Sequence, residues 1–193
     1  MMKNNLIMNR EWCMPNSRTF SIKPIQKLIE KYYDKDKITL NPFANESKYG
    51  ITNDINPNLN TDYHMDATEF LGKFDKDSVD LVLYDPPYTP TQLKEHYGNF
   101  PESKALYYTS KSSYWSNQKN MIADIVKGNG IVLSFGYDSN GMGKNRGFEL
   151  VEVLLVAHGG HHNDTIVTVE RKIKNTKLTD FDGFALEGDS NGD

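Results

Sequence analysis

An apolar run that ends in an acid and two prolines constrains this chain more than any other stretch. Residues 79–88 read Val-Asp-Leu-Val-Leu-Tyr-Asp-Pro-Pro-Tyr. A parallel strand is covered on both faces and reads as nearly continuous Val and Leu, so residues 79–84 are predicted to form one. Because proline lacks an N–H and fixes φ, Pro86 and Pro87 end the strand and hold the chain after Asp85 extended. In an open α/β sheet, ligands bind at this carboxyl end.

Strand patterns alternate with helix patterns along the rest of the chain. Residues 23–33 and 116–126 carry apolar side chains at helical spacing, and we expect Gly-Asn-Gly at 128–130 to end the second helix. A brief strand at 63–65 and a short helix are predicted within residues 61–71. The other predicted strands are residues 38–40, 49–52, 131–135, 148–157 and 165–171. This order predicts an α/β fold whose sheet is mostly parallel, with one antiparallel strand near the C-terminus and helices on both faces.

Length and charge favour one domain with an acidic tail. With 193 residues the chain is long enough to bury a single core, so residues 1–173 are predicted to form one domain, with residues 1–18 as an N-terminal arm. Residues 174–193 contain five acids against two lysines, which accounts for −3 of the net charge of −4. We expect this polar tail to be disordered. Because the remainder is close to neutral, the composition argues against strong sequence-independent phosphate binding.

Cysteine and histidine usage narrows the chemistry further. The single cysteine, Cys13, excludes an internal disulfide. Neither a signal peptide nor an apolar stretch of about 20 residues is present, so a cytoplasmic protein without membrane contact is expected. His158, His161 and His162 lie at a predicted hairpin tip without an accompanying cysteine. We therefore expect no metal site.

The tetrapeptide Asp85-Pro86-Pro87-Tyr88, placed after a buried strand, resembles the catalytic motif of S-adenosylmethionine-dependent amino methyltransferases that act on adenine N6 or cytosine N4. The resemblance implies a Rossmann-like methyltransferase fold with a seven-stranded sheet, and S-adenosylmethionine as cofactor. An exocyclic amino group is a poor nucleophile because its lone pair is delocalised into the ring. The Asp85 side chain and the Pro86 carbonyl can accept its hydrogens and stabilise the developing positive charge, while Tyr88 stacks on the base.

A second resemblance concerns the cofactor. Asn41-Pro42-Phe43-Ala44 is similar to the family's Asp-Pro-Phe-Ala-Gly-Ser-Gly loop, which lies under the amino-acid part of the cofactor. The resemblance implies that Asp54, at the end of the next strand, binds the ribose hydroxyls, since a carboxylate accepts two hydroxyl hydrogens at once.

The loop departs from the family pattern. It has Asn41 for the first acid and Asn45-Glu46-Ser47 in place of the glycines. Glycines permit positive φ and close backbone approach. Either Asn45 adopts the left-handed conformation, therefore, or the loop takes another path.

Lesser matches complete the motif order, so the resemblance extends over residues 19–172. Asp66 stands where the family places an acid or amide near the cofactor's adenine. Lys23 and Pro24, in Ser-Ile-Lys-Pro, resemble the entry to the family's first helix, which borders the methionine end of the cofactor. The final hairpin resembles the family's closing antiparallel strands. The arm with Trp12 either packs over the domain or helps to close the cofactor pocket.

The leading functional hypothesis is methylation of adenine N6 in DNA, by direct in-line transfer to a flipped base. DNA is the expected partner in preference to RNA. Residues 89–115 either form a lid or contact nucleic acid through Lys94, Lys111 and their aromatic neighbours, and His161 is a further candidate for substrate contact. The chain has no room for a target-recognition domain, so a separate recognition subunit or a homodimer is a candidate partner. The alternatives are methylation of cytosine N4, an RNA base or a protein amide, and a catalytically inactive binding subunit.

Overall fold

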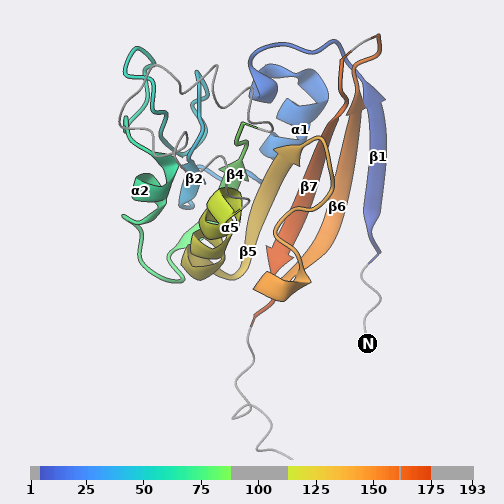
Figure 1. Ribbon diagram of the computed structural model, residues 1–193. Coiled ribbons are helices and arrows are strands. Elements are labelled where there is room, and N and C mark those ends of the chain that lie inside the picture. The colour runs from blue at the N-terminus through green and yellow to red at the C-terminus, as the bar shows by residue number, and fades with distance from the viewer. Residues whose placement is uncertain (1–4, 88–112, 161, 175–193) are drawn as a thin grey trace, which may run out of the picture.

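A computed structural model describes residues 5–87, 113–160 and 162–174 (Figure 1). These described residues form one sheet of seven strands in the order β1-β6-β7-β5-β4-β2-β3. The strands are β1 (Ile7–Trp12), β2 (Thr39–Asn41), β3 (Ile51–Thr52), β4 (Val79–Tyr84), β5 (Val126–Gly136), β6 (Phe148–Ala157) and β7 (Thr165–Lys172). The helices are α1 (Lys23–Tyr32), α2 (Ala67–Leu71) and α5 (Ser113–Ile125), with short 3-10 turns η1 (Thr19–Ser21) and η2 (Lys144–Arg146). The predicted disordered tail lies outside the described residues, apart from Lys174.

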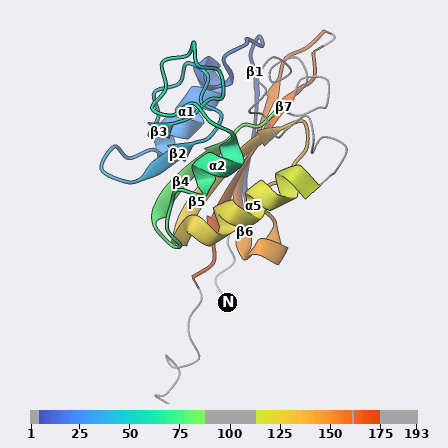
Figure 2. The same ribbon diagram turned by 60° about the vertical axis from the view of Figure 1, so that its left-hand side comes forward.

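The sheet is mixed in the way that the sequence predicts. Strands β3, β2, β4 and β5 are mutually parallel, whereas β7 runs antiparallel to both β5 and β6. Helices cover both faces, with α1 on one and α2 and α5 on the other (Figures 1 and 2). The predicted fold class is therefore confirmed: a Rossmann-like α/β fold with a mostly parallel seven-stranded sheet.

Two apolar cores lie on the two faces, and β4 contributes to both. Its Val82 and Tyr84 pack with α2 and α5, while Leu81 and Leu83 pack with α1. This double burial explains why the strand has no alternating polar pattern. The predicted bounds of β4 agree with the structure, and only Asp80 among its six residues is not buried.

The seventh strand comes from an unexpected place. Residues 7–12 of the arm form β1, which pairs in parallel with β6 at the edge of the sheet, so this part of the arm does not pack over the domain. The brief strand expected at 63–65 is reduced to an isolated bridge between Asn53 and Tyr63. Residues 7–12 form a strand because the backbone groups on the outer side of β6 need partners, and β1 supplies them.

The junction between α5 and β5 also differs from the prediction. Helix α5 ends at Ile125 and β5 begins at once, so Gly-Asn-Gly at 128–130 does not end the helix. The pairing with β4 shifts between Val126 and Ile131, and Asn129 adopts a φ of 68° inside this irregular stretch. The φ-permissive residues therefore accommodate a bulge within the strand.

None of the helices in the described part of the chain combines the length and apolar character that crossing a bilayer requires.

Candidate active site

The candidate site lies where the chain reverses its direction of travel across the sheet. From β2 the chain moves outward to β3 and then returns to β4 on the other side of β2. Crevices at such switch points, beyond the carboxyl ends of the strands, are the usual ligand sites of open α/β sheets. Asp85, Pro86 and Pro87 follow β4 at this position; Pro86 is buried, whereas Asp85 and Pro87 are half-buried.

A buried hydrogen bond holds the base of the motif. The Tyr84 hydroxyl donates to Oε1 of Gln118 on α5 at 2.8 Å, and both side chains are buried. Burial raises the pKa of Tyr84 well above its usual value, so its hydroxyl stays protonated and remains the donor of this hydrogen bond. The pair fixes α5 against β4 immediately before Asp85.

A hollow of about 250 Å³ opens beside the prolines, at the carboxyl ends of β4 and β5. Pro86 and Pro87 line one part of it, and Trp115 and Tyr137 contribute aromatic rings. The remaining lining residues are Tyr84, Lys119, Ser134, Phe135, Gly136, Asp138, Asn140 and Gly141. A hollow of this size, with aromatic rings and a few polar groups, suits one flat heterocycle of base size.

Two lining residues bring polar groups to this hollow. The Ser134 hydroxyl is buried and accepts or donates no hydrogen bond within the described part of the chain. Burial lowers the pKa of the Lys119 ammonium, and the nearby Asp138 carboxylate opposes this effect. Buried polar groups are normally hydrogen-bonded, so an orphaned hydroxyl in a pocket wall is a ready partner for a ligand.

The loop between β2 and β3 occupies the neighbouring part of the same edge. Asn45 adopts a φ of 50°, which is the left-handed conformation and one of the two outcomes that the sequence allowed. Its backbone N–H donates to Oδ2 of Asp54 at 3.1 Å. Asparagine tolerates this conformation better than most residues, which explains how the loop turns without the family's glycines.

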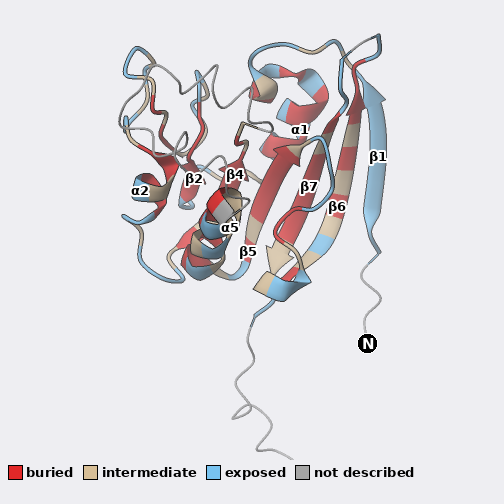
Figure 3. Cartoon of the chain, in the orientation of Figure 1, coloured by how far each residue is buried: buried red, intermediate tan, exposed pale blue. Residues whose placement is uncertain are grey.

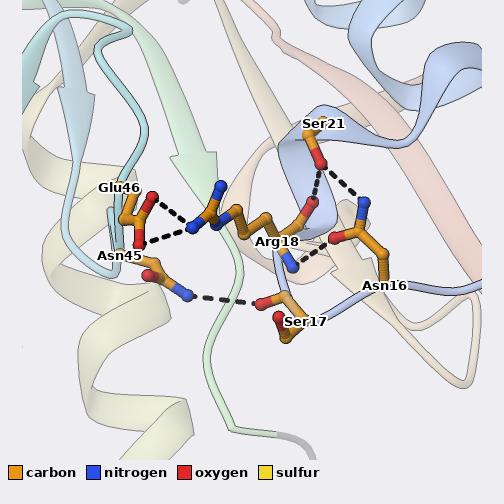
Figure 4. A network of polar contacts seen from close by, with 6 residues as sticks. All are labelled: Asn16, Ser17, Arg18, Ser21, Asn45 and Glu46. Carbon is orange, nitrogen blue, oxygen red and sulfur yellow. Dashed lines mark hydrogen bonds and ion pairs between the residues drawn. The ribbon is translucent and has the colours of Figure 1, made fainter.

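The N-terminal arm is bonded to this loop (Figure 4). The side-chain amide of Asn45 donates to the Ser17 carbonyl at 3.3 Å, and Arg18 forms an ion pair with Glu46 at 2.8 Å. Asn16 in turn accepts from the Arg18 backbone N–H and donates to Ser21. Residues 16–18 therefore lie against the loop between β2 and β3.

Residues 41–44, which begin the same loop, are buried. The Asn41 amide donates to the Ser47 hydroxyl at 3.1 Å, while its buried Oδ1 has no hydrogen-bond partner in the described residues. The Pro42 carbonyl accepts from the Asn53 amide, and Ala44 is buried. Phe43 packs edge-on against Tyr84, with ring centroids 5.8 Å apart, so the loop contacts the strand that carries the motif.

Asp66 is buried, and both of its carboxylate oxygens accept hydrogen bonds. One carboxylate oxygen accepts the backbone N–H of Thr68 at 2.8 Å and thereby caps α2, and the other accepts the Tyr114 hydroxyl at 3.2 Å. The side chain is 3% exposed. At the entry to α1, Pro24 is buried and Lys23 is exposed.

Four of the predicted site residues lie outside the described residues: Tyr88, Lys94, Lys111 and His161. His158 is buried, with Nδ1 2.7 Å from the Cys13 carbonyl oxygen and Nε2 2.9 Å from the Thr165 hydroxyl, so it joins the arm to the hairpin. Within the described ranges, no three His, Cys, Asp or Glu side chains gather as metal ligands would.

Apart from Pro86 and Pro87, the sequence did not identify the walls of the hollow. The hollow is lined by Trp115, Lys119 and Tyr137 together only because α5 packs on β4 and β5. The only signal in the sequence for Trp115 is its position near the start of the helix that follows the motif.

Comparisons with known proteins show the fold. No protein-family model matches the chain, and no curated protein sequence matches it. TrmN from Thermus thermophilus superposes with a TM-score of 0.51 at 18% identity, over 79% of this chain and 49% of TrmN. TYW2 from M. jannaschii, solved in complex with AdoMet, gives 0.44 at 12% identity, over 82% of this chain and 76% of TYW2. The chain thus spans about half of TrmN, and its likeness to that structure is one of fold: the Rossmann-like fold of the methyltransferases.

Proposed function

We propose that this protein transfers the methyl group of S-adenosylmethionine to the exocyclic N6 amino group of adenine in DNA. One observation carries the proposal: Asp85 and Pro86 lie between the loop of residues 41–47 and the base-sized hollow, all at one edge of the sheet. A methyl donor and an acceptor must approach the same point from two sides, and this arrangement supports that requirement.

The cofactor side offers groups that suit S-adenosylmethionine. Asp54 is half-buried and accepts N–H groups from Asn45 and Asn56, and a carboxylate is the kind of group that accepts ribose hydroxyl hydrogens. The orphaned Oδ1 of Asn41 is a second polar group at the start of the same loop. Residues 42–44 of the loop would lie under the amino-acid part of the cofactor, and Lys23 and Pro24 would border that end. Bound there, the cofactor supplies an electrophilic sulfonium methyl group.

The acceptor side accounts for activation of the amine. The Asp85 carboxylate and the Pro86 carbonyl each accept one N–H, which draws the nitrogen toward tetrahedral geometry and stabilises its developing positive charge. The two prolines keep these acceptors stiff. The rings of Trp115 and Tyr137 would hold the flat base in the hollow, since aromatic stacking favours nucleobases. Asp66 near the adenine and Lys94, Lys111, Tyr88 and His161 on the substrate side remain part of this proposal.

Calorimetric titration with S-adenosylmethionine tests the cofactor half. We expect saturable binding that weakens at least tenfold in Asp54→Ala, because the ribose hydroxyls lose their acceptor. No heat at millimolar ligand would instead indicate a catalytically inactive binding subunit.

Transfer of a tritiated methyl group tests the acceptor. DNA, RNA and protein are supplied together, and label is expected on adenine N6 in the DNA. Asp85→Ala should abolish transfer while retaining cofactor binding. Asp80→Ala is the matched control, since Asp80 lies on the same strand but pairs with Lys127 at 2.8 Å, away from the motif. Label in RNA, protein or cytosine would replace the adenine assignment, and label undiminished in Asp85→Ala would refute the mechanism.

A further inference from the structure

The outer strand of the sheet is unusually apolar and open. All six residues of β1 are exposed, and within the described part of the chain the strand has a neighbour in the sheet on one side only, β6 (Figure 3). Met8 is 72% exposed and Trp12 66%; Leu6 and Met14, just beyond the strand, are exposed as well. Half of the large apolar side chains that are exposed in the described residues belong to residues 6–14.

In the described residues, β1 lacks most of the features that protect natural sheet edges, and its only charged side chains are Arg10 and Glu11. Such edges are usually blocked by lysine, proline, a bulge or a covering segment, because unpaired N–H and C=O groups pair readily with another strand. Residues 7–12 contain neither lysine nor proline, and the pairing with β6 runs without interruption from Ile7 to Trp12. An edge of this kind is suited to forming an interface.

The two faces of β1 differ. The Asn9 amide donates to Glu152, which also accepts from Lys31 and Tyr32 of α1, so odd-numbered residues of β1 face the α1 side. Side chains alternate along a strand, so Met8 and Trp12 face the opposite side together. On that side Met8 lies beside Val153 and Trp12 beside Ala157, and Arg10 lies between them beside Leu155.

The backbone alternates in the same way. The Cys13 N–H donates to the Ala157 carbonyl, so odd-numbered residues direct their hydrogen-bonding groups toward β6. The N–H and C=O groups of Met8, Arg10 and Trp12 therefore point outward, to the side without a neighbouring strand.

We propose that two copies of this chain associate through β1, antiparallel about a two-fold axis at Asn9, to form one continuous sheet. This inference does not depend on the proposed methyl transfer. A two-fold axis perpendicular to the sheet keeps the apolar faces of both strands on the same side, so Leu6 of one copy meets Trp12 of its partner. The outward backbone groups of Met8 then bond those of Arg10 in the partner.

Among axes placed at residues 9 to 11, charge favours the one at Asn9. An axis at Arg10 would place two arginines directly opposite, and an axis at Glu11 would place two glutamates opposite, both of which are unfavourable. An axis at Asn9 sets two neutral amides against each other and pairs Arg10 with Met8. Because β1 carries one positive and one negative side chain, the interface as a whole is neutral.

Sedimentation equilibrium of the full chain tests the association. We expect a dimer at micromolar concentration, and we expect Met8→Lys to convert it to a folded monomer with native circular dichroism. Ile173→Lys is the matched control, because Ile173 is 50% exposed but lies beyond β7, and this variant should stay dimeric. A monomeric wild-type chain, or a dimer that withstands Met8→Lys, would overturn the proposal.

Disulfide trapping tests the register in a Cys13→Ser background. Asn9→Cys should crosslink two copies upon oxidation, since non-hydrogen-bonded antiparallel pairs have Cα atoms about 4.5 Å apart, within disulfide range. Glu11→Cys should not crosslink, because the two residues would be offset by about 13 Å along the strands. Crosslinking through residue 11 rather than residue 9 would refute the Asn9-centred interface.

Discussion

The backbone N–H of Asn45 donates to the Asp54 carboxylate at 3.1 Å and thereby joins the loop after β2 to the acid at the end of β3. The bond depends on the left-handed conformation of Asn45, whose φ is 50°. A short polar side chain tolerates this conformation, and here its amide also bonds the Ser17 carbonyl. Asn45 therefore replaces the family's glycines by a different route: backbone tolerance combined with a tether to the arm.

We expect Asn45→Gly to preserve the affinity for S-adenosylmethionine within about threefold, since glycine adopts positive φ without steric strain, and to lose less than about 1 kcal/mol of unfolding free energy with the exposed bond to Ser17. Asn45→Val should lower the free energy of unfolding by about 1–2 kcal/mol, because a β-branched side chain is strained in this conformation. Urea denaturation and calorimetric titration measure the two effects. Equal stability of the glycine and valine variants would show that the left-handed conformation is not needed.

The sequence predicted the conformation of the loop of residues 41–47 better than it predicted the walls of the hollow. The loop is contiguous, so Asn41 and Asn45 were visible as departures from one motif. Trp115 and Tyr137, in contrast, are separated along the chain by most of α5 and all of β5. Only the packing of that helix on the sheet brings them together, and residue patterns do not encode such distances directly.

Tyr84 and Gln118 should be energetically coupled. Tyr84→Phe leaves the buried Oε1 of Gln118 without a donor and should cost about 1–3 kcal/mol of unfolding free energy. Adding Gln118→Met removes the stranded acceptor, so the double variant should lose less than the sum of the two single losses. A double-mutant cycle by urea denaturation measures the coupling, and strictly additive losses would contradict it. Tyr49→Phe is a control, because the Tyr49 hydroxyl makes an exposed contact of 3.5 Å with Glu30.

The contrast between β4 and β1 shows what residue patterns reveal about strands. Strand β4 is covered on both faces, so its near-continuous apolar run predicted the strand and both of its ends. The β1 sequence is exposed on both faces and mixes Ile, Met and Trp with Asn, Arg and Glu. Its pairing with β6 rests on backbone hydrogen bonds, which leave no periodic signal in the side chains.

Lys119 should make stability rise with pH. Burial lowers its pKa below the unfolded value of 10.5, so the unfolded chain binds more protons than the folded chain in the interval between the two values. Stability therefore increases as the pH rises from the folded pKa to about 10.5, and below that interval the charged lysine carries a constant penalty. Lys119→Met removes the penalty, so this variant should be more stable than wild type at neutral pH and show a flatter profile. Urea denaturation between neutral and alkaline pH is the measurement; a steeper profile in Lys119→Met would contradict the assignment.

Glu170 should be far more important to stability than a surface carboxylate. It is 4% exposed on β7, and its two carboxylate oxygens accept the backbone N–H groups of Met142 and Gly143, in the segment that borders the hollow. In Glu170→Gln the amide NH₂ would face one of these donors, so a loss of about 1–3 kcal/mol in unfolding free energy is expected. Glu149→Gln is the matched control, because that half-exposed partner of Arg171 should contribute less than about 1 kcal/mol. Urea denaturation compares the two, and an equally small loss in both variants would show that the 142–143 segment does not depend on Glu170.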